Sequence, residues 1–136
     1  MSSMSDYLEN KVIDHMLRAQ AYTPPATLYL ALFTASTGLE ANNPTAEVSG
    51  GGYARQAITL SAASGGATSI SAAIEFPEAT ANWGTITHCA LVDHETNTSW
   101  GTNVNVLLAD ALTDSKAVDS GDVLRFKAGE IDLTFA

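Results

Sequence analysis

The first part of the chain shows the hydrophobic spacing of an amphipathic helix. Leu8, Val12 and Met16 recur every four residues, and neither Gly nor Pro interrupts them. Apolar residues at this spacing line one face of a helix. The pair Pro24-Pro25 ends the pattern, because proline lacks an N–H and restricts the residue before it. The pattern therefore predicts one helix over about residues 5–19.

The start of this helix has two possible caps. Ser5 or Asp6 can accept a hydrogen bond from a free backbone N–H, and Asp6 with Glu9 has the spacing of a capping box. The apolar stripe must be covered in one of two ways. It either closes one end of a β-domain in the same chain or packs on a neighbouring subunit.

From residue 26 the pattern changes to a period of two, which is typical of β-strands. Leu28, Leu30 and Leu32 share one face of the segment 26–34, and the opposite face is apolar as well. A strand that is apolar on both faces is covered on both sides. The segment is thus predicted to be a central strand.

Alternation of this kind recurs along the rest of the chain, with Gly, Asn, Asp and Ser between the segments. One connection, residues 35–52, is unusually long and is expected to be functional or mobile. The predicted strands cover 26–34, 53–60, 68–76, 85–93, 98–104, 106–112, 123–127 and 131–135.

Strict alternation also assigns faces within a strand. Over 85–93 it places Ile86 and Ala90 on one face, and Cys89 and Leu91 on the other.

About seven or eight short strands at fairly regular spacing predict an all-β, jelly-roll-like β-sandwich with one N-terminal α-helix. The 136 residues are enough for one hydrophobic core. We expect the N-terminal helix and a hinge in residues 1–24 and the β-sandwich domain in residues 25–136.

The charge balance narrows the possible partners. Six Lys and Arg stand against fifteen Asp and Glu, giving a formal net charge of −9. A nucleic-acid-binding protein needs clustered cations, as does a protein that binds anionic membranes, so we expect neither partner. No apolar run approaches the roughly 20 residues that cross a bilayer. The polar segment 1–10 does not read as a signal peptide.

Candidate catalytic chemistry is sparse. No Gly-x-Ser-x-Gly motif occurs, and the glycine-rich run 49–52 lacks the Lys-Ser/Thr ending of a phosphate-binding loop. The single cysteine, Cys89, allows no intrachain disulfide and reads as a small buried hydrophobe. We therefore expect no enzyme, no catalytic residue and no cofactor.

Two acidic segments are the only candidates for a metal site. Asp93 and His94 lie in a polar turn that is expected to be a solvated hairpin tip, and the stretch from Asp110 to Asp122 matches no calcium-loop spacing. No metal is predicted. A small hydrolase or a lectin-like metal protein that uses these residues is the third functional alternative.

Lysine is nearly absent. Lysine side chains on an exposed edge strand usually prevent that strand from pairing with another chain. Other subunits are therefore expected to cover edges or faces of the sandwich, in a homo-oligomer.

Several motifs together resemble the small structural proteins of tailed bacteriophages that are usually labelled tail fibre proteins. The resemblance covers most of the chain, from residue 5 to about 135. Its motifs are SDYLEN at 5–10, YTPPATLYLALF at 22–33, EVSGGGYAR at 47–55, FPEATANWG at 76–84 and SGD at 120–122.

The resemblance implies a non-enzymatic virion protein, made in the host cytoplasm. The first hypothesis is a capsid decoration or cement protein, a dimer or trimer that binds the major capsid protein and stabilises the assembled head. The alternative is a tail-fibre or baseplate module that binds host surface glycan through the loop 35–52. Tyr and Trp suit sugar binding, because they offer a flat apolar area with a polar edge to the face of a sugar ring. The candidate interaction residues are Tyr53, Arg55, Trp83 and Trp100, with Arg55 also able to brace a loop.

Overall fold

This computed structural model describes residues 3–134. The described residues contain nine strands and one helix, joined by loops. Their bounds are β1 Ser3–Met4, α1 Asp6–Leu17, β2 Leu28–Phe33, β3 Gln56–Ile58, β4 Ala67–Ser69, β5 Ile74–Glu75, β6 Gly84–Val92, β7 Val106–Val118, β8 Arg125–Phe126 and β9 Asp132–Thr134. The prediction of an all-β sandwich with one N-terminal helix is confirmed. Phe135, assigned to the last predicted strand, lies outside the described residues.

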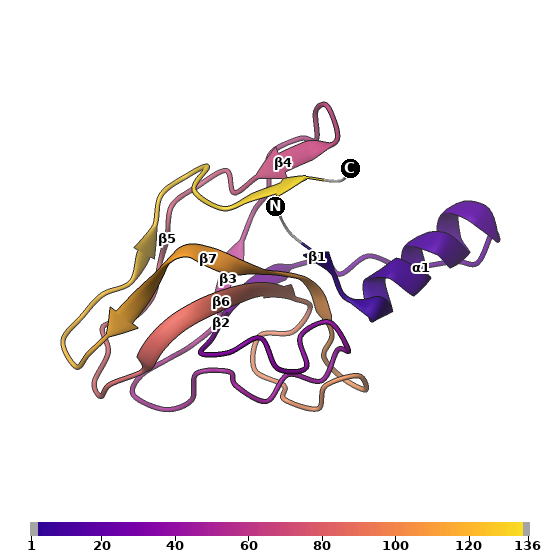
Figure 1. The fold of residues 1–136 in the computed structure, drawn as a ribbon. Helices are drawn as coiled ribbons and strands as arrows, with labels where there is room; N and C mark the ends of the chain where they lie inside the picture. Colours follow the sequence, from indigo (N-terminus) through magenta and orange to yellow (C-terminus); the bar gives the residue numbers. More distant parts are fainter. Residues whose placement is uncertain (1–2, 135–136) are drawn as a thin grey trace.

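The sandwich consists of one larger sheet and two small strand pairs (Figure 1). The larger sheet is antiparallel, in the order β1-β7-β6-β2-β3, and the pairs β4-β9 and β5-β8 lie over one of its faces. The main core fills the space between these layers. Its buried members include Leu30, Leu32, Ile70, Phe76, Ile86, Leu91, Phe126 and Leu133.

Strand β2 is covered on both faces, as its two-sided apolar pattern predicts. Leu30 and Leu32 belong to the main core, whereas Ala31 and Phe33 belong to a second buried cluster on the opposite face of the sheet. All four are fully buried. Because two clusters share this strand, β2 connects the two halves of the core.

An irregularity in the pairing of β6 with β7 changes the faces that strict alternation assigns. The pairing of β6 with β7 shifts its register between Ile86 and His88. Ile86 therefore lies in the same cluster as Cys89 and Leu91, while Ala90 lies in the cluster on the other face. The prediction that Ile86 and Ala90 share a face is wrong, because the alternation of β6 is interrupted where three extra residues of β7 enter the pairing between Lys116 and Ala111.

Two of the strands predicted from the sequence differ from the observed elements. Residues 98–104 form turns instead of a strand, with the Ser99 carbonyl accepting from the N–H groups of Asn103 and Val104 at 2.9 and 3.3 Å. The partner of β6 is the longer strand β7. The predicted strand 68–76 is split into β4 and β5, because its two halves pair with different strands, β9 and β8.

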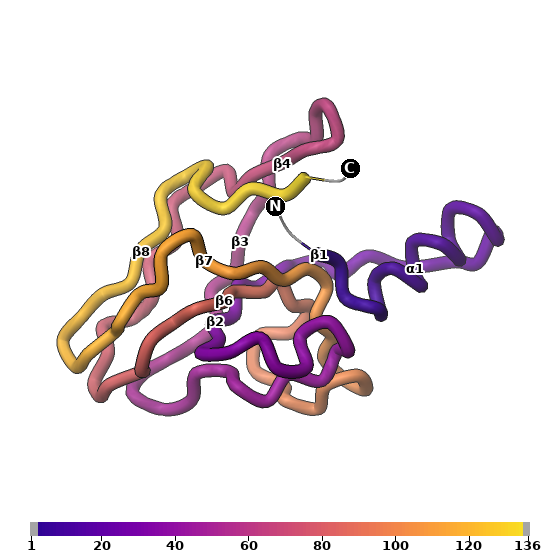
Figure 2. Tube along the Cα trace, in the orientation of Figure 1, coloured from indigo at the N-terminus to yellow at the C-terminus, as the bar shows by residue number. Residues whose placement is uncertain are grey.

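The long connection 35–52 packs against the residues that join β6 to β7 (Figure 2). Asn42 ties the two segments together. Its Nδ2 donates to Asn105 Oδ1 at 2.9 Å, and its Oδ1 accepts from the Val106 N–H at 2.7 Å. Leu39 lies buried in the second cluster. This connection therefore forms the cover of the second face of the sheet.

Helix α1 lies apart from the sandwich, to which its base is attached (Figure 1). Ser5 is the N-cap, since its Oγ accepts from the Leu8 N–H at 3.2 Å, and the same hydroxyl donates to the Val106 carbonyl. The capping-box alternative with Asp6 is not formed. No residue of α1 is buried, so the helix does not close the end of its own sandwich. Among the described residues, no helix has the length and apolar character that crossing a membrane requires.

Candidate functional site

A groove lies where the connection 35–52 meets the turns that follow β6. Its volume is about 420 Å³, within the roughly 300–1,000 Å³ of ordinary ligand pockets. Glu47, Tyr53, Arg55, Glu95 and Trp100 contribute to its walls. Three of the four interaction residues predicted from sequence therefore line one groove.

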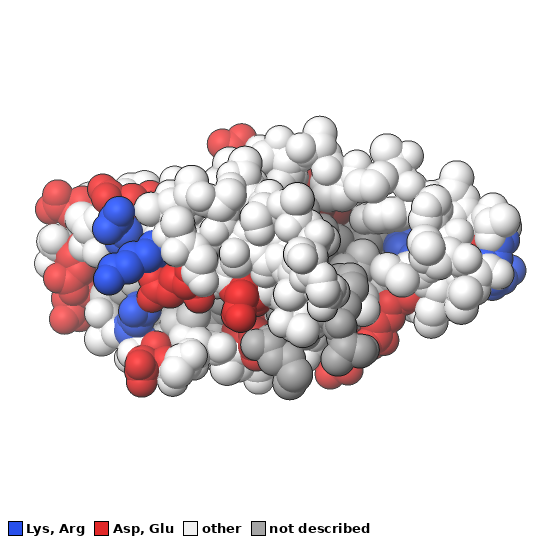
Figure 3. Space-filling view, turned by 90° about the horizontal axis from the view of Figure 1, so that it is seen from above, with Lys and Arg blue, Asp and Glu red and all other residues white. Residues whose placement is uncertain are grey.

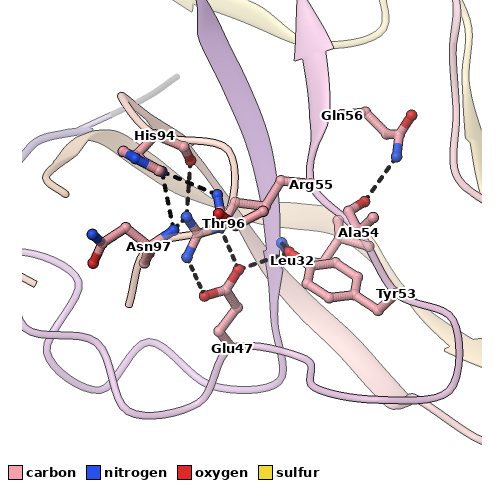
Figure 4. Close-up of polar contacts among 9 residues, drawn as sticks. All are labelled: Leu32, Glu47, Tyr53, Ala54, Arg55, Gln56, His94, Thr96 and Asn97. Carbon is pink, nitrogen blue, oxygen red and sulfur yellow. Dashed lines mark hydrogen bonds and ion pairs between the residues drawn. The ribbon is translucent and has the colours of Figure 1, made fainter. Parts of the chain in front are cut away.

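An ion pair between Arg55 and Glu47 holds the groove together (Figure 4). Arg55 Nε and Nη2 donate to the two carboxylate oxygens of Glu47, both at 2.7 Å. The Nη1 of Arg55 donates to the carbonyls of His94 and Asn97, at 2.9 and 3.0 Å. One guanidinium thus joins the entry of β3, the connection 35–52 and the turn after β6. The planar, multidonor shape of arginine suits this task.

Tyr53 extends the network toward the core. Its hydroxyl donates to Glu47 Oε1 at 2.9 Å and accepts from the Leu32 N–H at 3.0 Å. Burial, together with the negative charge of Glu47, raises the pKa of the Tyr53 phenol far above its ordinary value. Tyr53 therefore remains a neutral hydrogen-bond donor and fixes the Glu47 carboxylate against β2.

Trp100 is half-buried at the groove, and its ring is already engaged. The Arg55 guanidinium lies 5.0 Å from the centre of the Trp100 ring, in a cation–π contact. Phe33 lies 6.4 Å from it, centroid to centroid. These contacts fix the ring as part of the wall.

Trp83 lies in the core behind the groove and is only 6% exposed. Its ring packs edge-on against Tyr53 at 5.5 Å, and its Nε1 donates to the Gly51 carbonyl at 2.8 Å. Gly51 has a φ of +59°, and a Cβ at this position would meet the Trp83 ring at 3.0 Å. Trp83 thus contacts and hydrogen-bonds the glycine-rich segment on the side that faces the core. The interaction role of Tyr53, Arg55, Trp83 and Trp100 stays a prediction.

Glu47 lines the groove and pairs with Arg55, but the sequence did not predict it as part of the site. Its only sequence signal is a single carboxylate between Ala46 and Val48, eight residues before Arg55. Such spacing does not indicate an ion pair unless the course of the loop between the two residues is known.

Asp93 and His94 form hydrogen bonds within and next to the turn after β6. Asp93 accepts from the backbone and side-chain nitrogens of Asn105, at 2.6 and 2.9 Å. His94 Nδ1 accepts from the N–H groups of Thr96 and Asn97. Within residues 3–134, no group of three or more His, Cys, Asp or Glu side chains is placed to hold a metal ion.

Cys89 is a buried free thiol, which confirms its predicted burial. Desolvation, with a smaller contribution from the charge of Asp110, raises the pKa of the thiol to about 12. Because only the thiolate is nucleophilic, this environment keeps Cys89 unreactive in the folded protein.

The raised pKa of Cys89 predicts a loss of stability at alkaline pH. An unfolded thiol ionises near pH 8.5, so above this pH the unfolded state releases a proton that the folded state retains. The free energy of unfolding should then fall as the pH rises, by at most about 1.4 kcal/mol per pH unit from this group. Urea unfolding at about pH 8 and about pH 10 should show a larger fall for the wild type than for Cys89→Ala. An identical fall in both proteins would contradict the buried-thiol account.

A family model described as Gp80, podophage GP4 fiber I protein gp80, matches residues 3–134. No curated protein matches the chain. The matched residues include α1, the sandwich and the whole groove.

Proposed function

Because the chain belongs to the family of the podophage GP4 fiber I protein gp80, we propose that it is a tail-fibre module that binds the surface of the host cell. Family membership makes it a structural protein of a tailed phage. The family name favours a fibre over capsid decoration, so it supports the alternative hypothesis from sequence better than the first one.

The groove is the observation that carries the host-binding part of this proposal. Thr45, Ser49 and Thr98 place hydroxyl groups along it, and Glu95 adds an exposed carboxylate. Donors and acceptors of this kind match the hydroxyl groups of a carbohydrate. We therefore take a surface polysaccharide as the ligand class.

The groove also has the preorganisation that recognition needs. The Arg55–Glu47 pair fixes two walls, and the Tyr53 hydroxyl fixes the same carboxylate to β2. Binding then costs little ordering of the protein. The carboxylate of Glu47 is fully engaged by these partners, which fits a binding role and no catalytic step. Weak binding by one module gains strength where a virion presents many copies.

A binding assay with whole host cells and with their extracted surface polysaccharide tests this function. Thr98→Arg places a long side chain in the groove from an exposed position, and at least a tenfold loss of affinity is expected. Thr102→Arg is the matched control, because Thr102 is exposed on the neighbouring turn and does not line the groove. Equal binding by wild type and Thr98→Arg would exclude the groove.

The place of the protein in the particle can be tested separately. Immunogold labelling of intact particles should put the label on the tail. Label spread over the head would instead favour the capsid decoration protein.

A further inference from the structure

The groove between the connection 35–52 and the turns after β6 contains one cation and two acids among its lining residues. Arg55 is the cation, and Glu47 and Glu95 are the acids. All other residues that line it are uncharged. The charge that a bound polysaccharide meets therefore depends on which of these three groups is available to it.

Arg55 has no charge to offer to an acidic ligand. Its side chain is only 3% exposed, and its Nε and Nη2 donate to both carboxylate oxygens of Glu47. Its Nη1 donates to the carbonyls of His94 and Asn97. An acidic sugar would have to displace Glu47 from a two-bonded arginine–carboxylate pair, which is among the strong hydrogen-bonded pairs of proteins. This arginine therefore does not make the groove an anion site.

Glu95, in contrast, is presented to a ligand. It lies exposed in the turn after β6 and lines the groove. None of the hydrogen bonds and ion pairs among residues 3–134 engages its carboxylate. Its charge is therefore uncompensated by a neighbouring cation, and it repels an anion that enters the groove.

No other Lys or Arg of the chain lines the groove. Lys11 and Arg18 belong to α1 and its cap, whereas Lys116, Arg125 and Lys127 belong to β7, β8 and the turn after β8. In the view of Figure 3, the basic side chains gather at the two ends of the molecule. With six basic against fifteen acidic residues, the chain as a whole also repels an anionic polymer.

We propose that the groove takes a non-acidic surface polysaccharide and that Glu95 is the residue that excludes acidic sugars. This inference rests on the host-binding function proposed above and narrows its ligand class. Neutral sugar hydroxyls can pair with Thr45, Ser49 and Thr98 without burying a charge. A sugar carboxylate would lose water beside Glu95 with no available cation among the lining residues, and an unpaired charge is costly to bury.

An acidic sugar held by the same hydroxyl groups is the competing arrangement, because a hydroxyl donates to a carboxylate as well as to a neutral oxygen. Such a sugar keeps its full charge close to Glu95, whereas a neutral sugar escapes this repulsion. The two arrangements therefore differ in how binding responds when the charge of Glu95 is changed.

Binding of the full chain to host surface polysaccharide, separated by anion exchange into a neutral and an acidic fraction, tests the proposal. The wild type should bind the neutral fraction. Oxidation of the primary alcohols of this fraction to carboxylates should weaken binding by about threefold or more at low salt, and added salt should reduce the difference. Glu95→Lys should instead bind the oxidised polymer more tightly than the neutral one.

A matched control separates the position of the charge from its total. Glu78→Lys makes the same change at an exposed glutamate that does not line the groove, so it should keep the preference of the wild type. Circular dichroism and melting curves of both variants should match the wild type, because both sites are exposed.

Two outcomes distinguish this inference from the host-binding function. Preferred binding of the acidic fraction by the wild type, lost in Thr98→Arg, would overturn the inference and leave the groove as the host-binding site. An identical response of wild type and Glu95→Lys to oxidation of the polymer would also overturn it. Binding to neither fraction would overturn the host-binding function itself, and the inference with it.

Discussion

Replacing Arg55 by methionine is expected to destabilise the protein by about 3–5 kcal/mol, the cost of removing one partner of a buried ion pair. The side chains of Arg55 and Glu47 are only 3% and 13% exposed. The substitution leaves the Glu47 carboxylate without its cation and removes the donor to the His94 and Asn97 carbonyls. Urea unfolding followed by circular dichroism should show a lower midpoint with an unchanged slope.

Two further variants make the Arg55 result specific. Arg18→Met removes the cation of an exposed pair, whose side chains are 64% and 40% exposed, and should change stability by no more than about 0.5 kcal/mol. Arg55→Met combined with Glu47→Leu should recover part of the loss, because no buried charge remains unpaired. A loss below about 1 kcal/mol in Arg55→Met would mean that water replaces the guanidinium, contrary to the burial of this pair.

Replacing Trp83 by alanine is expected to cost about 3–5 kcal/mol, as for other large aromatic residues removed from a core. Trp83 contacts the rings of Tyr53 and Phe76 edge-on, at 5.5 and 6.3 Å, and Phe76 in turn contacts Phe126. The cavity would therefore open at the centre of the aromatic cluster. The hydrogen bond to the Gly51 carbonyl would also be lost.

Trp83→Phe divides this effect into its parts. It keeps an aromatic ring but removes the indole N–H and part of the buried ring volume, so its cost should lie between the about 0.5–1.5 kcal/mol of one hydrogen bond and the full cost of Trp83→Ala. The same variant should bind polysaccharide as the wild type does when both are folded, since Trp83 lies behind the groove. Weaker binding by the folded Trp83→Phe protein would show that the indole takes part in recognition. Val123→Ala, at an exposed site, serves as the stability control.

The sequence by itself determined the elements whose signal is local. The spacing of Leu8, Val12 and Met16 predicts α1, and the two-sided apolar pattern of 28–33 predicts a strand covered on both faces. Side-chain periodicity follows directly from backbone geometry, so it is visible in one short segment. The all-β class follows from the repetition of this signal.

Only the tertiary structure decided which faces are covered and which distant residues meet. The register shift between β6 and β7 and the split of 68–76 into β4 and β5 arise from strand partners that lie far away in sequence. The same holds for the candidate site, where Arg55 reaches Glu47 and the carbonyl of His94. Periodicity shows that the stripe of α1 is apolar, but not whether the same chain covers it. In the folded chain no residue of α1 is buried, and the long connection 35–52 covers the second face of the sheet.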